Sequence, residues 1–386
     1  MGDFIRMKDI IDYIKSFLTY GDTEAAKHIG YTADKELWHN YKLVIIPNGH
    51  LGKDWVLPSM ANVHAETQNG VLVIEEDIIY TTLFFISRAE ELICPERDEH
   101  GRFAAKYSIL GTHNYLQIPL LDEYARSVMK LLELPLPKNG FNHIYLTHDI
   151  DKISNFRHLR GFIGGWLRDG MDAVLDAAEN IKNDPAYTFP WLAKQDSKVP
   201  NAEVIYFVKD TKGKGYDYPQ YNLQGKDWTR LKKYLKSKKV TFGLHSSYYG
   251  DLPDKITYTA HRSHFLRCSI DQMQRLADAG ITDDFTMTFA DVAGFRLQTT
   301  RAVRWINPKT MTLTNLTLHP LTVMDGTLYQ DNYMHLDEDE SYYYCLQLFD
   351  KVRQHHGDLC LLWHNIDLEQ TPWHKTLYEQ LISTLR

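Results

Sequence analysis

Apolar and polar positions follow two different periods along the chain, one typical of helices and one typical of strands. The first third contains helical spacing of apolar residues, short apolar runs and one run that changes from apolar to acidic. These patterns predict helices over residues 9–18, 77–91 and 121–132, and strands over residues 42–47 and 70–75. We therefore expect a small α/β unit here.

A break in this pattern lies at residues 134–140, where Pro135, Pro137 and Gly140 follow the last predicted helix. Proline and glycine end helices and favour turns. We place a domain boundary here. It separates an N-terminal α/β domain of unknown role, residues 1–138, from a second domain, residues 139–386.

Strand-like and helix-like runs alternate after the boundary, which predicts a parallel sheet or barrel. The predicted strands are residues 144–150, 204–208, 241–245, 261–267, 294–297, 314–318 and 359–363. The predicted helices are residues 171–182, 228–236, 270–279 and 341–354. The helix at 270–279 has the clearest ends, because Ser269 and Gln272 form a capping-box pattern and Gly280 follows as a stop.

Composition narrows the class of protein. The chain has 386 residues, of which 44% are hydrophobic and 24% charged, as in ordinary globular proteins. Lys and Arg number 43 against 50 Asp and Glu, so the net charge of −7 favours neither nucleic acid nor an anionic membrane. No apolar run reaches the roughly 18 residues of a membrane helix. The first residues lack a signal-peptide pattern, and four scattered cysteines indicate reduced thiols, so we expect a cytoplasmic protein.

Polar residues end several of the predicted strands, and in parallel α/β folds chemistry gathers at that edge of the sheet. Asp149 and Asp151 share one face of their strand. His245 and His364 each end an apolar strand. Arg262 and His264 share a face of the 261–267 strand, and Arg296 follows Phe295 in the 294–297 strand. Taken singly, each fits an ordinary strand end or a structural histidine.

Taken together, one aspartate and two neutral histidines match a catalytic metal site with an open coordination position. Asp151, His245 and His264 fit this count, and a divalent cation among them leaves a formal charge of +1. A bound cation would polarise a carbonyl and activate water. Asp149 and His364 are then the candidate base and acid.

These residues resemble the NodB-type polysaccharide deacetylases, metal-dependent carbohydrate esterases with a distorted (β/α) barrel. The resemblance covers roughly residues 141–386. Residues 77–91 and 98–103 look like the N-terminal region of a divergent bacterial branch of that family. The resemblance implies a distorted barrel of the deacetylase type that follows a small N-terminal α/β domain.

The resemblance also implies roles for single residues. Asp149 corresponds to the base and Asp151 to a metal ligand. His245 begins the family's second motif, but Tyr249 stands where its second histidine belongs, so His264 is our candidate replacement and His261 the reserve. Phe295 and Arg296 would lie beside the base, although no proline follows Arg296. His364 would be the acid, oriented by Asp284 or Asp291, and Tyr249, Phe295 and Trp363 would contact the substrate.

The implied reaction is hydrolysis of an acetamide, or of an acetyl ester, on a saccharide or glycan precursor. Its cofactor would be one divalent metal ion, with zinc preferred over cobalt, iron or nickel. Two other functions stay open. One is a degenerate barrel that binds sugar without turnover, because Tyr249 and the missing proline depart from the motifs. The other is hydrolysis of a small non-sugar amide on the same scaffold.

Overall fold

The computed structural model describes residues 2–157, 159–211, 213–218, 221–366, 368, 371 and 373–386. Its helices are α1 (Gly2–Leu18), α2 (Thr23–Ala26), α3 (Ile78–Ser87), α4 (Glu90–Ile93), α5 (Ile109–Thr112), α6 (Leu120–Leu131), α7 (Leu159–Asp169), α8 (Met171–Glu179), α9 (Phe189–Asp196), α10 (Lys226–Lys236), α11 (Ile270–Asp278), α12 (Asp325–Tyr329), α13 (Glu338–Gln354) and α15 (Trp373–Ser383). Short 3₁₀ helices are η1 (Lys35–Asn40), η2 (Ala105–Tyr107), η3 (Ile181–Asn183), η4 (Gly215–Asp217) and η5 (His264–Leu266).

The strands form two sheets. They are β1 (Ile29–Tyr31), β2 (Leu43–Ile45), β3 (Ala65–Gln68), β4 (Val71–Ile74), β5 (His143–Ile150), β6 (Glu203–Lys209), β7 (Thr241–Ser246), β8 (Ala260–Ser263), β9 (Asp283–Met287), β10 (Val303–Asn307), β11 (Thr312–Pro320), β12 (Val323–Met324) and β13 (Asp358–Leu362). The small sheet has the order β1-β2-β4-β3, and the large sheet has nine strands in the order β10-β11-β9-β8-β7-β6-β5-β13-β12.

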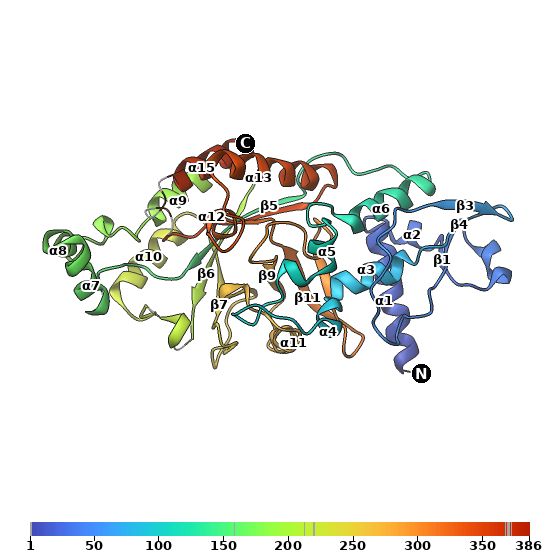
Figure 1. Cartoon of the computed structure of the whole chain (residues 1–386), viewed down its shortest axis with the longest axis horizontal. Coiled ribbons are helices and arrows are strands. Elements are labelled where there is room, and N and C mark those ends of the chain that lie inside the picture. The colour runs from blue at the N-terminus through green and yellow to red at the C-terminus, as the bar shows by residue number, and fades with distance from the viewer. Residues whose placement is uncertain are drawn as a thin grey trace.

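The large sheet curls into a half-barrel, which is compatible with the predicted α/β barrel (Figure 1). All its pairs are parallel except β10 with β11. Helices α13 and α15 run along one side of it, and the small sheet lies at the opposite end of the molecule from α7 and α8 (Figure 1). The parallel order brings the carboxyl ends of β13, β5, β6, β7 and β8 to one edge.

One hydrophobic core connects the first third of the chain to the large sheet. Every residue of α3 is buried, as expected of a helix that is apolar on all sides and lies inside the protein. The core includes Ile10 and Phe84 as well as Trp305 and Leu318 of β10 and β11. Packing is thus continuous across residue 138, and the division into two domains stays a prediction.

The structure corrects two of the predicted strands. The 261–267 strand ends at Ser263, and η5 follows it with Phe265 and Leu266 at positive φ. Residues 294–297 form a loop, because Gly294 has a φ of 152° and Phe295 N donates to Leu116 O in place of a strand partner. Strands β9 and β10 lie outside every predicted range.

Within the described parts of the chain, no helix combines the length and the apolar character needed to cross a bilayer. The four cysteines are free thiols. Half of the predicted capping box of α11 is present, since the Ser269 side chain accepts a hydrogen bond from Gln272 N. The Gln272 side chain instead donates to Ser246 Oγ and Ser263 Oγ.

Candidate metal centre

Asp151, His245 and His264 form a group that could hold a metal ion, with one ligand atom of each residue within 4.8 Å of the others. Asp151 Oδ1 lies 3.6 Å from His245 Nε2 and 3.3 Å from His264 Nε2. Asp151 directly follows β5, His245 lies in β7, and His264 begins η5. The turn after β8 therefore supplies the third side chain.

The outer nitrogen of each histidine is held by a hydrogen bond. His245 Nδ1 lies 3.1 Å from Arg262 O, and His264 Nδ1 lies 2.8 Å from Asp217 Oδ1. A carbonyl and a carboxylate only accept hydrogen bonds, so each Nδ1 carries the proton and each Nε2 is directed at Asp151. Partners of this kind orient histidine ligands in metalloproteins.

Two buried atoms of the group lack hydrogen-bond partners among the described residues, namely Asp151 Oδ1 and His245 Nε2. A buried polar atom without a partner is costly and needs an explanation. A carboxylate oxygen and an imidazole nitrogen that face each other are both acceptors, and a cation between them would satisfy both. The residues present therefore fit a divalent metal ion.

The surroundings shift the pKa values of these groups. Burial raises the pKa of the Asp151 carboxyl, but the charge of Lys209 and the nearby imidazoles of His245 and His264 hold that pKa well below its usual value. Burial lowers the pKa of His245. Burial also lowers the pKa of His264, but the neighbouring carboxylates of Asp151 and Asp217 outweigh this effect and raise the pKa.

Asp149 lies beside the metal group and is paired with an arginine from β8. Its Oδ1 is 3.1 Å from Arg262 Nη1, and its Oδ2 is 3.7 Å from His245 Nε2. Arg262 is fully buried and also donates to Phe285 O. It stacks on Phe207, with the guanidinium carbon 4.5 Å from the ring centroid. The core thus fixes Arg262 against Asp149.

His364 faces both aspartates from the end of β13. Its Nε2 is 3.9 Å from Asp149 Oδ2 and 3.9 Å from Asp151 Oδ2. Its Nδ1 is 2.6 Å from Asp325 Oδ1, and its backbone N donates to Asp325 Oδ2. Burial lowers the pKa of His364, but Asp325 and the two other aspartates raise it well above its usual value.

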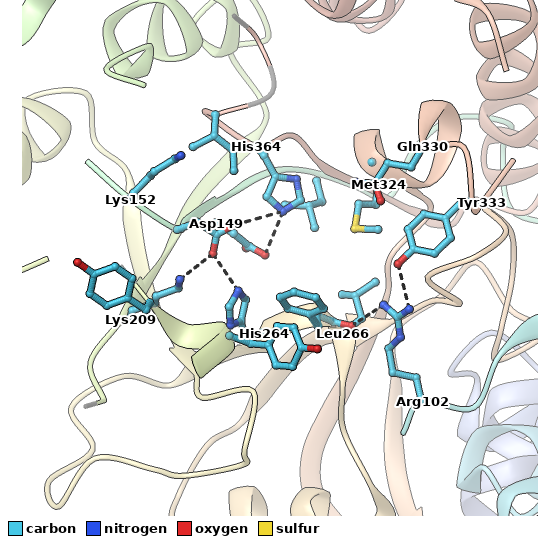
Figure 2. A pocket seen from close by; sticks show the side chains of 17 residues that line it. Arg102, Asp149, Lys152, Lys209, His264, Leu266, Met324, Gln330, Tyr333 and His364 are labelled. Atoms are coloured by element: carbon cyan, nitrogen blue, oxygen red, sulfur yellow. Dashed lines mark hydrogen bonds and ion pairs between the residues drawn. The ribbon is translucent and has the colours of Figure 1, made fainter. Parts of the chain in front are cut away.

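A cavity of about 350 Å³ opens over these groups. Lys209, His264 and His364 converge near Asp149, and Arg102 meets Tyr333 on another side of the cavity (Figure 2). Arg102 Nη2 donates to Tyr333 Oη, and Arg102 Nε pairs with Asp98 at 2.7 Å. Tyr216 and Phe265 also line the cavity, and Tyr216 is 51% exposed, so aromatic faces lie open beside the charged groups.

The structure separates Arg296 from Asp149. Arg296 Nη2 pairs with Glu91 Oε1 at 2.7 Å, and Arg296 Nη1 donates to Thr288 O. The expectation that Arg296 sits beside the base is wrong, and Arg262 stands there instead. Arg296 lies in the loop of residues 294–297. Arg262 lies in β8, which is separated from β6 in the sheet by β7 alone.

Three other predicted roles are also not borne by the residues proposed for them. Asp284 Oδ2 lies 2.6 Å from His261 Nδ1, and His261 Nε2 is occupied by Ser246 Oγ at 2.8 Å. These bonds remove Asp284 as the partner of His364 and His261 as the reserve metal ligand. Asp291 accepts a hydrogen bond from Ala105 N and does not contact His364.

The three predicted substrate residues do not line the cavity. Phe295 and Trp363 are buried in the hydrophobic core under α13 and α15. Tyr249 is 43% exposed and packs against Tyr248, and Lys214 lies over its ring. Tyr216 and Tyr218 line the cavity instead.

Several residues of the site escaped the sequence reasoning: Lys209, Asp217, Arg262 in its role beside Asp149, and Asp325. Two of them, Lys209 and Asp325, had a weak signal in the sequence. Lys209 ends the apolar strand at 204–208, and Asp325 follows the apolar residues of β12. A search of every charged residue after an apolar run would have found both.

Comparison with known proteins extends only to the first third of the chain. Residues 6–137 match a family of unknown function, DUF7033. No curated protein matches the chain. No solved structure matches it either.

Proposed function

We propose that this chain is a metal-dependent hydrolase that removes acetyl groups from a saccharide or glycan precursor. The observation that carries the proposal is the group of Asp151, His245 and His264, which lies beside Asp149 and His364 at the edge of a parallel sheet. The motifs that resemble NodB-type deacetylases support the same reaction class, as does the curled α/β sheet.

Asp151 and the Nε2 atoms of His245 and His264 would hold the cation. A divalent metal bound there supplies a Lewis acid for a carbonyl oxygen and lowers the pKa of water. Two imidazoles and one carboxylate suit Zn²⁺ best, and Co²⁺, Fe²⁺ and Ni²⁺ are compatible.

Asp149 is the proposed general base. Its Oδ2 faces the ligand group, while its Oδ1 is held by Arg262 at 3.1 Å. One oxygen is thus positioned by a charge-assisted hydrogen bond and the other is left to take a proton from water. The buried guanidinium also balances the charge of a carboxylate that is itself 3% exposed.

His364 is the proposed general acid. Asp325 accepts from its Nδ1 at 2.6 Å, so its Nε2 points toward Asp149 and the cavity. A protonated Nε2 there would deliver its proton to the amine nitrogen that leaves the acetyl carbon. Asp325 fixes the ring orientation, which is the role first assigned to Asp284 or Asp291.

The cavity favours a sugar as the substrate. Tyr216, Phe265 and Tyr333 line it, and aromatic side chains commonly pack against the apolar side of a pyranose. Gln330 and Lys152 line the same cavity and can bond hydroxyl groups.

Acetate release from a panel of N- and O-acetylated saccharides tests this function. The protein is stripped with chelator, reloaded with Zn²⁺ or Co²⁺, and compared with Asp149→Asn. The Asp291→Asn variant is a matched control, because it changes an aspartate that bonds Ala105 N away from the cavity. We expect metal-dependent release by wild type and Asp291→Asn, and its loss in Asp149→Asn. No release by any metal-loaded form from any substrate would refute the proposal.

One observation favours the second function, a barrel that binds sugar without turnover. Lys209 Nζ lies 3.3 Å from Asp151 Oδ1 and neutralises this carboxylate with a side chain of the chain itself. Saccharide binding of equal strength with and without divalent metal, and no acetate release, would identify this function.

A further inference from the structure

Lys209 is a buried cation at the proposed metal ligands that the function above does not use. It ends β6 and is 4% exposed. It pairs in register with His245 of the neighbouring strand β7, so the two side chains leave the sheet on the same face. Its side chain lines the cavity (Figure 2), and its ammonium lies beside Asp151.

The ammonium contacts the same oxygen that a metal would need. Asp151 Oδ1 lies 3.3 Å from Lys209 Nζ, 3.3 Å from His264 Nε2 and 3.6 Å from His245 Nε2. Asp151 Oδ1 has no hydrogen-bond partner among the described residues. The contact between Lys209 and this oxygen is therefore an ion pair that does not have the geometry of a hydrogen bond. The attraction is therefore one between charges, without the directional bond that would lock the side chain in place.

A metal ion and this ammonium are incompatible as neighbours. A divalent cation binds carboxylate oxygen at about 2.0–2.2 Å. A cation at that distance from Asp151 Oδ1 would lie within a few ångströms of the Lys209 charge, where like charges repel strongly in a site shielded from water. The long, flexible lysine side chain can swing toward the cavity that it lines.

We propose that Lys209 competes with the divalent cation for Asp151 and so sets the metal affinity of the site. This inference rests on the proposed metal site. Cation binding must displace the ammonium, and the energy of the lost ion pair is subtracted from the binding energy. Replacement of Lys209 by an uncharged residue of similar length removes the competitor and leaves all three ligands intact.

Calorimetric titration of chelator-treated protein with Zn²⁺ tests the proposal on wild type, Lys209→Met and Lys152→Met. Lys152 lines the same cavity, so it controls for the general effect of removing a positive charge. We expect the Kd for Zn²⁺ to be at least about tenfold lower in Lys209→Met than in wild type. The change in Lys152→Met should be clearly smaller. Lys209→Gln is a second replacement in case the methionine variant does not fold, as judged by circular dichroism.

Thermal unfolding gives an independent readout. Without metal, Lys209→Met leaves the Asp151 charge without its partner, so the melting temperature should fall, and Zn²⁺ should restore it. Equal Zn²⁺ affinity in wild type and both Lys209 variants, or an equal gain in Lys152→Met, would overturn the role of Lys209 and leave the metal site standing. No Zn²⁺ binding by any folded form would overturn the metal site itself. If Lys209→Met bound Zn²⁺ and the wild-type protein did not, the competition would be supported. Lys209 would then keep metal out of the wild-type site.

Discussion

Each histidine of the candidate site is fixed through one ring nitrogen and presents the other. The partners are a backbone carbonyl for His245, Asp217 for His264 and Asp325 for His364. All three Nε2 atoms lie within 3.9 Å of an oxygen of Asp151. Positioning of this kind sets the geometry of a reaction before substrate arrives.

The role of His364 gives the first prediction. His364→Gln keeps a polar side chain but cannot donate a proton as an acid, so acetate release should fall by about 10²–10⁴-fold in kcat, with a small change in KM. His143→Gln is the matched control, since His143 is exposed and pairs with Asp358 away from the cavity. Steady-state kinetics measures both. Full activity in His364→Gln would remove this residue from the mechanism.

Sequence reasoning located the ligand group but not its supporting residues. Asp151 and His245 were expected together because polar residues at the ends of parallel strands meet at one edge. His264 was expected on a strand over 261–267, and it reaches the group although that strand ends at Ser263. Which arginine pairs with Asp149, Arg262 or Arg296, depends on the order of the strands in the sheet. The spacing of residues along the sequence does not give that order. Asp325 escaped notice because it follows a strand of only two residues, β12.

At the scale of elements, a buried cluster of charges ties α3 and α4 to the loop after β9. Glu91 pairs with Arg88 at 2.7 Å and with Arg296 at 2.7 Å. Burial raises the pKa of Glu91, but the two arginines outweigh it and lower the pKa to about 2. Arg296 thus serves this junction between elements rather than the site.

This cluster predicts a pH dependence of stability. A carboxyl whose pKa is lower in the folded state stabilises the fold above its ordinary pKa, and this stabilisation is lost as pH falls through the folded value. A shift from 4.5 to about 2 corresponds to about 3 kcal/mol. The wild-type advantage over Glu91→Gln in free energy of unfolding should shrink by about this amount between about pH 6 and about pH 2. Urea titrations at several pH values measure it, and a constant difference would contradict the assignment.

At Gly294, the loop of residues 294–297 lies close against the backbone at Leu116. A Cβ at this position would lie 2.4 Å from Leu116 O, and its φ is 152°. Phe295 N donates to that same oxygen at 2.7 Å. Gly294→Ala should therefore lower the free energy of unfolding by about 1–3 kcal/mol. Gly140→Ala, also at positive φ but with open space around it, is the control in the same denaturation assay. An equal effect of the two would point to backbone strain alone.

Elements with clear periodicity were predicted well, and irregular ones were not. The α11 helix and strands β5, β6, β7, β11 and β13 overlap their predicted ranges. Strand β9 begins with two aspartates, one of them fully buried against His261, so its sequence does not look like a buried strand. The loop at 294–297 looked like a strand because its apolar residues face a core without pairing.

At the scale of the whole molecule, the first third of the chain packs into the same core as the large sheet. Contacts across the proposed boundary include Trp55 Nε1 to Pro308 O and Arg88 Nη2 to Cys268 O. The cavity itself takes Arg102 from the first third. The predicted small α/β unit therefore helps to build the wall of the candidate site.

This shared core predicts cooperative unfolding. The full chain should lose its near- and far-ultraviolet circular dichroism in one transition, and residues 139–386 alone should be poorly soluble because Trp305 and Leu318 lose their cover. Expression of that fragment beside the full chain tests this. Two separated transitions, or a fragment as stable as the full chain, would instead support two independent domains.

The central claim is that one divalent cation binds among Asp151, His245 and His264. Anomalous X-ray diffraction from crystals of the protein soaked in Zn²⁺ tests it most directly. We expect one strong peak at about 2.0–2.2 Å from an oxygen of Asp151 and from the Nε2 atoms of His245 and His264, with Lys209 turned away from Asp151. Density that shows Lys209 still against Asp151 and no zinc among these side chains, at millimolar zinc, would contradict it.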